Sequence, residues 1–421
     1  MTVRSDSPIW RPYTQMLNAD PPIDIVRAEG VWLETRDGRR ILDAISSWWV
    51  NIHGHNHPRL NRALTQQLER FAHVIFAGFT HEPAERLAKQ LLEHLPGELT
   101  RVFYSDDGST AVEVALKMAY QAWRNRGESQ RTLFVALEGA YHGDTFGAMA
   151  VGGSLGFHGM FSDLLFDVLY LPHPDTGPAY EKLDRIFDEH GERIAAVIIE
   201  PMVQGAAGMI FWPAQFLRAV RERSREAGVP LIADEVFTGF GRTGRFLACE
   251  HGPIVPDIVC LSKALTGGYL PMGATLCTEE IYEAFLSESR ATALLHGHSF
   301  TGNALACAVA LESLTLFDDE ARLERVAHIE TLHQTALERV SGLPTVRRVR
   351  ALGALAAIDL EPSGHGGYFD ARAPALYGQF LERNVLLRPL GNTLYILPPY
   401  VITDDELALV FRALGDVIAA A

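Results

Sequence analysis

The fold is decided by the stretch Asp257-Ile-Val-Cys-Leu-Ser-Lys263-Ala-Leu-Thr-Gly-Gly-Tyr269. Four apolar residues run together after Asp257, which predicts a short buried strand over residues 257–261. Lys263 therefore follows the end of a strand, where α/β proteins place their chemistry. The glycines after it let backbone approach a ligand closely. A lysine that is partly desolvated in such a place has a lowered pKa and can form a Schiff base, although a single lysine at a strand end is more often an ordinary surface residue.

Strands and helices alternate through the middle of the chain. Short runs that are apolar throughout predict the strands, and apolar residues at helical spacing predict the helices. The predicted strands are 101–105, 132–137, 168–171, 195–200 and 230–235, and two predicted helices are 110–123 and 214–226. Strands that are apolar on both sides suit a parallel sheet covered on both faces. The sequence therefore predicts an α/β fold with a mostly parallel central sheet.

The two ends of the chain predict a smaller α+β domain. Residues 31–35 and 40–43 flank an Asp-Gly turn, which is typical of a hairpin. The later elements are predicted helices at 303–317 and 323–340, short strands at 354–360, 385–388 and 393–397, and a last helix after Thr403. We therefore expect a large domain over residues 47–317 and a small domain made of residues 1–46 and 318–421.

Composition excludes several classes of function. The 421 residues carry a net charge of −15, from 37 basic and 52 acidic side chains, and contain no long Lys/Arg run, so nucleic acid is not an expected partner. No apolar run reaches membrane-spanning length. Cys249, Cys260, Cys277 and Cys307 form no C-x-x-C pair and are expected to be reduced core residues. A cytoplasmic protein without membrane contact is the expectation.

Two patterns indicate ligands that we do not expect. His53, His55 and His57 alternate, but no acidic residue or cysteine lies near them in the sequence, so no metal site is predicted. Residues 239–244 fit the G-x-G-x-x-G dinucleotide motif and follow a strand. The sequence after Gly244 is too short and broken for the long helix that this motif requires, and the strand before it ends in two acids. An NAD-type oxidoreductase is therefore the weaker alternative.

Three features converge on one kind of ligand. Gly108 and Ser109 open a predicted helix, whose free N–H groups favour an anion, although they would equally serve as a simple helix cap. Asp234 ends an apolar strand, and a buried carboxylate needs a cationic partner such as a protonated pyridine nitrogen. Lys263 supplies an amine. A phosphate seat, an acid and an amine together match pyridoxal phosphate.

The sequence resembles the class III pyridoxal phosphate-dependent aminotransferases, which have fold type I, over essentially its whole length. Residues 233–244, Ala-Asp-Glu-Val-Phe-Thr-Gly-Phe-Gly-Arg-Thr-Gly, and residues 262–268, Ser-Lys-Ala-Leu-Thr-Gly-Gly, carry this resemblance. Residues 11–16 and 46–49 also resemble motifs of the branch that serves biotin biosynthesis. The resemblance implies transfer of an amino group from S-adenosylmethionine to 8-amino-7-oxononanoate, which gives 7,8-diaminononanoate.

The resemblance also implies a role for each matching residue of the cofactor site. Lys263 would form a Schiff base with pyridoxal phosphate and move the proton between Cα and C4′. Asp234 would pair with the pyridine nitrogen, and Tyr141 would stack on the ring. Gly108 and Ser109 would hold the phosphate.

The same resemblance implies a homodimer with its active sites at the interface. Gly297, His298 and Ser299 match a motif that holds the phosphate of the neighbouring subunit, and Gly297 would also touch substrate. The family usually has Gly-Pro-Thr at this place, so His298 is a departure that adds bulk and a donor.

The resemblance places the keto substrate among residues from distant parts of the chain. Tyr13 and Trp48 would line its site together with Tyr141 and Lys263, and Arg388 would bind its carboxylate. If Trp48 and Trp49 lie on a strand, they point to opposite faces, so one of them is free to line a pocket.

The carboxylate of the amino donor needs a second site, for which Arg242 is the candidate. Relatives that use glutamate as donor commonly carry an acid soon after a Gln-Gly pair, but here Gln204-Gly205 is followed by Ala206-Ala207. This difference argues against glutamate and suits S-adenosylmethionine. Lysine as donor stays open, as does another class III transaminase that acts on ω-amino acids or diamines.

Overall fold

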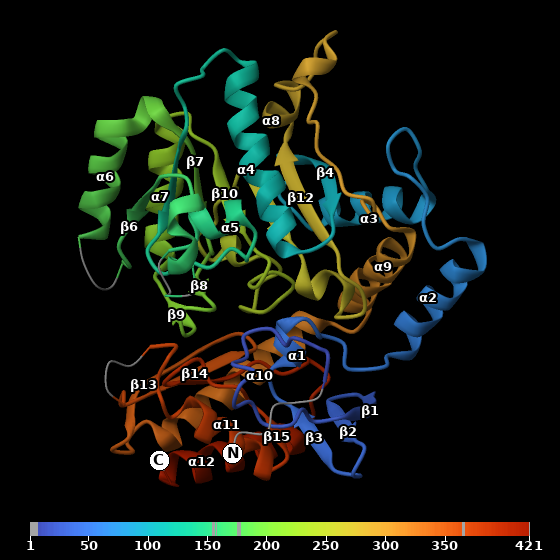
Figure 1. The fold of residues 1–421 in the computed structure, drawn as a ribbon, viewed down its shortest axis with the longest axis vertical. Helices are drawn as coiled ribbons and strands as arrows, with labels where there is room; N and C mark the ends of the chain where they lie inside the picture. Colours follow the sequence, from blue (N-terminus) through green and yellow to red (C-terminus); the bar gives the residue numbers. More distant parts are fainter. Residues whose placement is uncertain (1–6, 154–155, 157, 175–177, 364–366, 421) are drawn as a thin grey trace.

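The computed structural model describes residues 7–153, 156, 158–174, 178–363 and 367–420. A large sheet flanked by helices fills one half of the molecule, and the N- and C-terminal elements lie together in the other half (Figure 1). Within these described residues, no helix is both long and apolar enough to cross a membrane.

The large sheet has seven strands in the order β4-β12-β11-β10-β7-β5-β6. These strands are β4 Leu99–Ser105, β5 Leu133–Leu137, β6 Val168–Leu171, β7 Ile194–Ile199, β10 Leu231–Asp234, β11 Ile258–Leu261 and β12 Gly273–Thr278. The pairs from β11 to β6 are parallel, and β12 runs antiparallel to both β11 and β4. The prediction of a mostly parallel sheet is confirmed. β12 is the strand that the sequence analysis missed.

Helices cover both faces of this sheet, as strands that are apolar on both sides require. On β7, Ala196 and Ile198 share a core with α4, whereas Val197 and Ile199 belong to the core on the other face. The helices are α2 Pro58–Arg70, α3 Glu82–Glu93, α4 Gly108–Asn125, α5 Phe146–Val151, α6 Ala179–His190, α7 Ala214–Glu226, α8 Glu279–Glu283 and α9 Ala304–Asp319. Short 3₁₀ turns are η1 Gly159–Leu164, η2 Gly191–Arg193, η3 Ala248–His251, η4 Lys263–Thr266 and η5 Arg290–Thr292.

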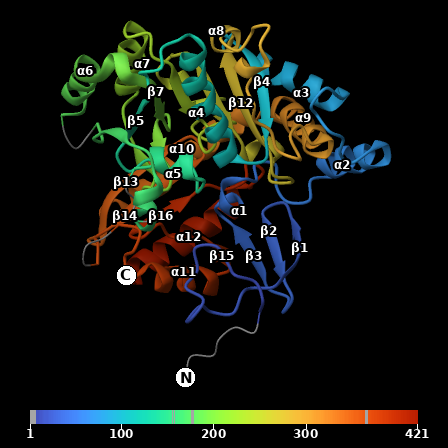
Figure 2. The same cartoon turned by 45° about the horizontal axis from the view of Figure 1, so that its top comes forward.

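The predicted N-terminal hairpin is confirmed and joins a strand from the far end of the chain. Trp32 of β2 pairs antiparallel with Leu42 of β3, and Val385 of β15 pairs parallel with Leu42. Figure 2 shows the N-terminal strands beside β15. This sheet consists of β1 Ile25–Glu29, β2 Trp32–Thr35, β3 Arg40–Asp43 and β15 Val385–Leu386.

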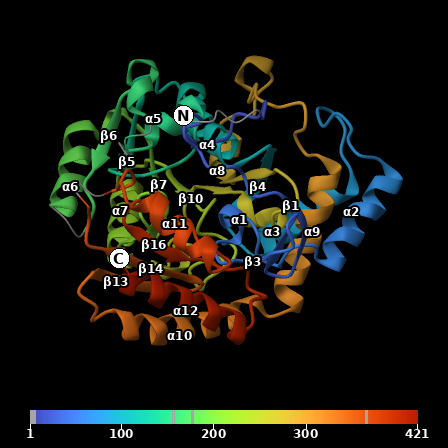
Figure 3. The ribbon, with the colours of Figure 1, turned by 60° about the horizontal axis from the view of Figure 1, so that its bottom comes forward.

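A second C-terminal sheet completes this half of the molecule. It consists of β13 Val346–Leu352, β14 Leu355–Leu360 and β16 Thr393–Ile396, with helices α10 Arg322–Val340, α11 Ala373–Glu382 and α12 Asp404–Ala420. These helices share one apolar core with the strands, and Figure 3 shows α10 and α12 beneath β13 and β14. The strands β8 Val203–Gln204 and β9 Ile210–Phe211 form a separate two-stranded sheet, whose turn accepts hydrogen bonds from Arg350 of β13. We propose the predicted boundaries near residues 46 and 318 for this small domain, of which residues 1–6, 364–366 and 421 lie outside the described part.

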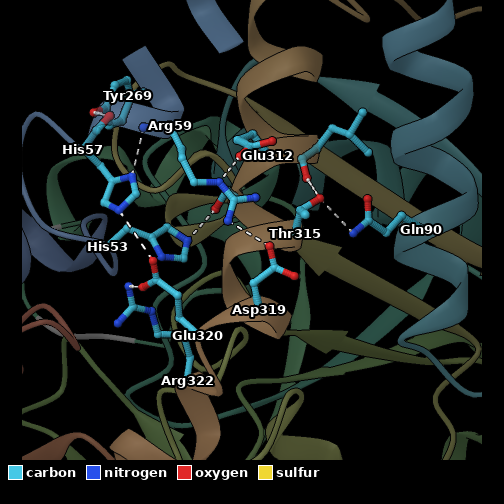
Figure 4. A network of polar contacts seen from close by, with 12 residues as sticks. His53, His57, Arg59, Gln90, Tyr269, Glu312, Thr315, Asp319, Glu320 and Arg322 are labelled. Atoms are coloured by element: carbon cyan, nitrogen blue, oxygen red, sulfur yellow. Dashed lines mark hydrogen bonds and ion pairs between the residues drawn. The ribbon is translucent and has the colours of Figure 1, made fainter. Parts of the chain in front are cut away.

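A polar network fastens α2 to α9 and to the turn before α10 (Figure 4). Arg59 lies 2.5 Å from Glu312 and 2.8 Å from Asp319, and His57 lies 3.7 Å from Glu320. His57 also caps α2, because its ring accepts a hydrogen bond from the Arg59 amide. This network links the large sheet's helices to the first turn of the small domain.

The three alternating histidines have three different partners. His53 contacts a serine hydroxyl of α9 at 3.1 Å, His55 contacts Asp43 at 3.0 Å, and His57 belongs to the network above. Across the described part of the chain, no group of three or more ligating side chains could hold a metal ion. The acidic partners come from distant residues, which the sequence analysis did not foresee.

The glycine motif at 239–244 folds as a series of turns rather than as a dinucleotide site. Only the four residues of η3 follow it as helix, which confirms that the long helix of that motif is not formed.

Candidate active site

A cavity of about 400 Å³ opens at the carboxyl ends of the large sheet's strands. Its walls include Ser109, Tyr141, Glu200, Asp234 and Lys263, each of which follows or ends a different strand. Such a crevice is the usual ligand site of an open α/β sheet. The cavity therefore brings together five of the residues that were predicted to hold the cofactor, namely Gly108, Ser109, Tyr141, Asp234 and Lys263.

The N-terminus of α4 forms the floor at which an anion would sit. Asp107 caps the helix, because its carboxylate accepts from the Thr110 amide at 2.8 Å while Thr110 accepts in return from the Asp107 amide at 3.0 Å. A Cβ at Gly108 would lie 2.6 Å from a Val236 methyl, and a Cβ at Gly143 would lie 1.8 Å from the Ser109 hydroxyl. Only glycine fits at these two positions, and the closeness leaves amides and one hydroxyl facing the cavity.

Asp234, at the end of β10, is oriented by two donors. Its Oδ2 lies 2.7 Å from His142 Nδ1, and its Oδ1 accepts from the Val236 amide at 3.0 Å. His142 is completely buried at its side chain and Asp234 is 5 % exposed, so the pair is shielded from water. The sequence analysis gave His142 no role.

Glu200, directly after β7, is a second acid that the sequence analysis missed. Its carboxylate accepts hydrogen bonds from the amides of Tyr141 at 2.9 Å and Gly205 at 3.0 Å. Burial raises the pKa of Glu200 to about 7, against the lowering effect of these amides and of nearby His142. Because parallel strand ends meet at one edge, the strand-end rule that identified Asp234 would also have identified Glu200.

Lys263 follows β11 in a left-handed backbone conformation, with φ +46°. Its amine lies 4.7 Å from the ring centre of Trp49 and 5.5 Å from that of Phe237. The side chain is partly open to the cavity, but protein atoms crowd the amine. Burial lowers the pKa of Lys263 to about 8, although the charges of Asp234 and Glu200 oppose this shift. A substantial fraction of the amine is therefore neutral near physiological pH.

A second cavity of about 440 Å³ adjoins the first. Trp49, Tyr141, Ala206 and Lys263 line both, so the two cavities meet at the reactive amine. The second cavity's other walls include Tyr13, Trp48 and Arg388, together with Asp144, Tyr368, Tyr377 and Tyr395, which the sequence analysis did not predict.

Tyr13 closes the second cavity from the N-terminal segment. Its hydroxyl donates to the Asp144 carboxylate at 2.8 Å and lies 3.2 Å from the Tyr141 hydroxyl. Burial raises the pKa of Tyr13 to about 12 and raises that of Tyr141 as well. The Tyr13 ring centre is 5.8 Å from that of Trp48, and the Arg388 guanidinium lies 5.2 Å from the same ring.

Trp48 and Trp49 do not lie on a strand. They belong to α1 (Ser46–Trp49), in which four consecutive residues have φ of +52°, +45°, +70° and +73°. A left-handed residue other than glycine costs roughly 1–2 kcal/mol, so the turn is strained. The prediction that one tryptophan lines a pocket rested on strand geometry, and that premise was wrong. Trp49 is 4 % exposed and bonds Tyr395, whereas Trp48 is 43 % exposed.

Residues 14–418 match the family model of the class-III aminotransferases. The chain belongs to the class III aminotransferase family. It is 48% identical over 419 residues to the adenosylmethionine-8-amino-7-oxononanoate aminotransferase of Synechococcus elongatus, a match that covers 97% of this chain and 98% of the relative.

Solved structures give the same family likeness and confirm the fold. The enzyme of the same name from Methanocaldococcus jannaschii superposes with a TM-score of 0.94 at 39% identity, covering 98% of this chain and 97% of that one. An amine transaminase from an uncultivated Pseudomonas species, in its PLP-bound form, superposes with a TM-score of 0.93 at 32% identity, covering 99% and 100%.

Within this aminotransferase fold, Arg242 lies behind the cavities rather than in their walls. It is 1% exposed, and its guanidinium donates to the Trp49 carbonyl at 2.8 Å and to the Ser46 hydroxyl at 3.3 Å. Its guanidinium carbon also lies 5.2 Å from the Tyr400 ring centre. This placement does not support the prediction that Arg242 holds the donor's carboxylate. The structure uses it to hold α1.

Gly297, His298 and Ser299 are likewise missing from the described walls of both cavities in the single chain. His298 Nδ1 lies 3.0 Å from Asp106 Oδ2, although the atoms do not align as a hydrogen bond. His298, which stands where the family usually has proline, thus contacts Asp106 of its own chain. A phosphate contact from these residues to another copy of the chain stays a proposal.

Proposed function

We propose that the chain transfers the amino group of S-adenosylmethionine to 8-amino-7-oxononanoate and so makes 7,8-diaminononanoate for biotin synthesis. The observation that carries this proposal is the second cavity, which joins the cofactor cavity at Lys263 and has Arg388 in its wall. Aromatic walls with one guanidinium suit a long apolar chain that ends in a carboxylate. The named relatives support the same substrates.

The first cavity fits pyridoxal phosphate. The crowded glycines at the start of α4 leave amides for the phosphate, Asp234 would face the ring nitrogen, and Tyr141 would lie on the ring. When bound, the cofactor supplies an aldehyde that reacts with amines and a ring that accepts electrons from the substrate carbon. Lys263 is the amine within reach of both cavities.

Proton transfer falls to Lys263 in this proposal. An amine with a pKa of about 8 can take a proton from the substrate carbon and return it within the working range of pH. The His142 and Val236 donors fix the Asp234 carboxylate in one orientation, so it can hold a proton on the ring nitrogen opposite. Glu200 holds the Tyr141 backbone, and thereby the ring that would cover a bound cofactor, in place.

The choice of S-adenosylmethionine as donor is supported by Ala206. This residue lines both cavities at the place where glutamate-using relatives commonly carry an acid. Because residue 206 is an alanine, it offers the Arg388 guanidinium no carboxylate with which to pair. Arg388 would therefore not be drawn away from the cavity when a donor with a second carboxylate, such as glutamate, binds. Lysine as donor is the nearest alternative. An amine or ω-amino acid transaminase is the second, because the amine transaminase above shares the fold.

A donor panel tests this proposal. The purified chain is loaded with pyridoxal phosphate, and its visible absorption is followed while S-adenosylmethionine, lysine, glutamate or a diamine is added. S-adenosylmethionine should bleach the band, and 8-amino-7-oxononanoate should then restore it with formation of 7,8-diaminononanoate, detected by mass spectrometry. Turnover with lysine or diamines but none with S-adenosylmethionine would replace the proposed donor. Failure of every donor with the keto acid would overturn the substrate itself.

We also infer a cytoplasmic homodimer whose subunits complete each other's sites. Phe79, Leu295 and Phe300 expose 66%, 78% and 61% of their surfaces, and Leu295 and Phe300 flank the 297–299 motif. Exposed apolar side chains of this kind suit an interface that a second subunit covers. The four free, buried cysteines suit a reducing compartment. Light scattering of the purified chain measures the assembly, and a fully active monomer would contradict it.

A further inference from the structure

The left-handed turn Ser46–Trp49 needs an external cause. No residue in it is glycine, and all four have positive φ. Local preferences therefore work against the turn, and contacts from outside must hold it. The turn is also where function is concentrated, because Trp48 lines the substrate cavity and Trp49 packs on the Lys263 amine.

Asp43 supplies three of the contacts that hold the turn. Its side chain is completely buried, at the end of β3. One carboxylate oxygen accepts from the amides of Ile45 at 3.2 Å and Ser47 at 3.0 Å. The other accepts from the Ser47 hydroxyl at 2.7 Å and lies 3.0 Å from His55 Nε2. Three of these four partners lie inside or directly before the turn, so the buried carboxylate stabilises the turn in its left-handed form.

His55 fixes the carboxylate from the opposite side. Its backbone is held by a two-way bridge to Gly30, with N–O distances of 2.7 and 3.1 Å. A rigid backbone keeps the imidazole at Asp43, and the imidazole offsets the cost of burying a carboxylate. The Asp43 carboxylate thus contacts His55 on one side and the left-handed turn on the other.

Strand β3, which ends at Asp43, also connects the turn to Arg388. The amide of Ala44 donates to the carbonyl of Leu386 in β15 at 3.1 Å, and β15 leads directly to Arg388. Two residues after β15, the guanidinium lies against the Trp48 ring. β3 therefore sets the positions of Trp48, through Asp43, and of Arg388, through β15.

We propose that Asp43 is a positioning residue for the keto substrate: it selects the left-handed turn at Ser46–Trp49 and thereby sets Trp48 against Arg388. The proposal rests on the proposed function, because the keto acid is the ligand that this wall would bind. Asp43 acts through geometry, since its carboxylate is filled by His55 and the turn and has no place in the cavity walls among the described residues.

Three variants separate geometry from charge. Asp43→Ala removes every acceptor and should raise KM for 8-amino-7-oxononanoate by at least about tenfold, with a smaller change in kcat. Asp43→Asn keeps an oxygen for the two amides and should stay within roughly threefold of the wild type. Asp43→Ala/Ser47→Gly should recover much of the lost affinity, because glycine adopts positive φ without strain. Ser47→Gly alone serves as its reference.

Asp359→Ala is the matched control. Asp359 is another paired acid of the small domain, which binds Arg350 at 2.7 and 2.9 Å but does not contact the turn. If small-domain damage in general caused the KM change, this variant would show it too. Hydrogen exchange supplies a readout apart from activity: the amides over residues 45–50 should exchange faster in Asp43→Ala and not in Asp359→Ala.

The outcomes are distinct. An Asp43→Asn variant as impaired as Asp43→Ala, with no gain from Ser47→Gly, would mean that the negative charge acts and would overturn the proposal. Unchanged exchange over 45–50 in Asp43→Ala would overturn it as well. A wild-type chain that does not turn over 8-amino-7-oxononanoate would instead contradict the proposed function. The hydrogen-exchange data would still test whether Asp43 holds the turn.

Discussion

The two cavities that meet at Lys263 are built in different ways. The cofactor cavity takes Asp234, Glu200 and Lys263 from the ends of neighbouring strands in one sheet. The substrate cavity takes Tyr13 from the N-terminal segment, Trp48 from a strained turn and Arg388 from beyond β15. The reactive groups thus sit on rigid scaffold, and the groups expected to choose the substrate sit on irregular segments.

This division explains how one fold serves different substrates. The amine transaminase superposes with a TM-score of 0.93 at only 32% identity, so the two chains share the fold while most of their side chains differ. Function on a common fold resides in such local differences. Variants in the cofactor cavity should therefore damage both half-reactions, and variants in the substrate cavity should damage one.

The largest effect is expected from Lys263→Ala. Without its amine the chain loses both the group that binds the aldehyde and the group that moves the proton. Positioned acid–base catalysis alone contributes roughly 10²–10⁴-fold, so turnover should disappear in both half-reactions. Steady-state assays measure the loss, circular dichroism verifies folding, and the exposed Lys89→Ala is the control. Near wild-type transamination by the variant would end the assignment of the cofactor cavity.

Asp234→Asn should come next. An amide cannot hold a proton on the ring nitrogen as a carboxylate does, so the rate should fall by about 10²-fold or more while some cofactor stays bound. The two half-reactions, followed by stopped-flow absorbance, should lose similar factors. An unchanged rate would mean that Asp234 and His142 form only a structural pair.

The sequence predicted the cofactor cavity better than the substrate cavity, for a physical reason. An apolar run followed by Lys263 or Asp234 indicates a strand end locally, and parallel strand ends then meet at one edge. Glu200 obeys the same rule and was simply not used. β12 escaped because its run, Gly-Ala-Thr-Leu-Cys-Thr, begins with glycine and mixes polar with apolar residues.

The turn at Trp48 could not be predicted from local sequence. Its left-handed form opposes the preferences of its own residues and depends on Asp43, on the Arg242 guanidinium and on the Leu397 carbonyl that accepts from Ser46. These contacts join segments separated by up to 351 positions. The same contacts explain why Arg242, although it lies in a recognisable motif, lies behind the walls of the two cavities.

Arg388→Ala should separate the two cavities. Loss of a charged hydrogen-bonding partner costs about 1.5–3 kcal/mol, so KM for the keto acid should rise by roughly 10–150-fold. The half-reaction with the amino donor should change much less. Arg388→Lys is the matched variant, and it should recover only part of the affinity because an ammonium cannot form the two-pronged contact. Equal damage to both half-reactions would mean that Arg388 is shared or structural.

The smallest expected effect is a pH dependence of cofactor capture. A neutral amine is required to attack the aldehyde, and burial lowers the pKa of Lys263 to about 8. The capture rate of the cofactor-free chain should therefore rise with pH, by roughly tenfold between pH 7 and 9, and level off above that. Absorbance after mixing with pyridoxal phosphate gives the rate, and a free lysine derivative corrects for the cofactor's own titration.

Two variants test the cause of that pH dependence by the direction in which they move the break in the capture rate. The Glu200 carboxylate favours the charged amine, so Glu200→Gln should move the break in the capture rate to lower pH. Tyr13, with a pKa raised to about 12, keeps its proton across this range, so Tyr13→Phe should leave the break in place. A break near the ordinary lysine value in the wild-type chain, or an upward shift in Glu200→Gln, would contradict the account of a desolvated amine. A downward shift in Glu200→Gln but not in Tyr13→Phe would show that the titrating amine responds to charges in the cofactor cavity and not to groups of the substrate cavity.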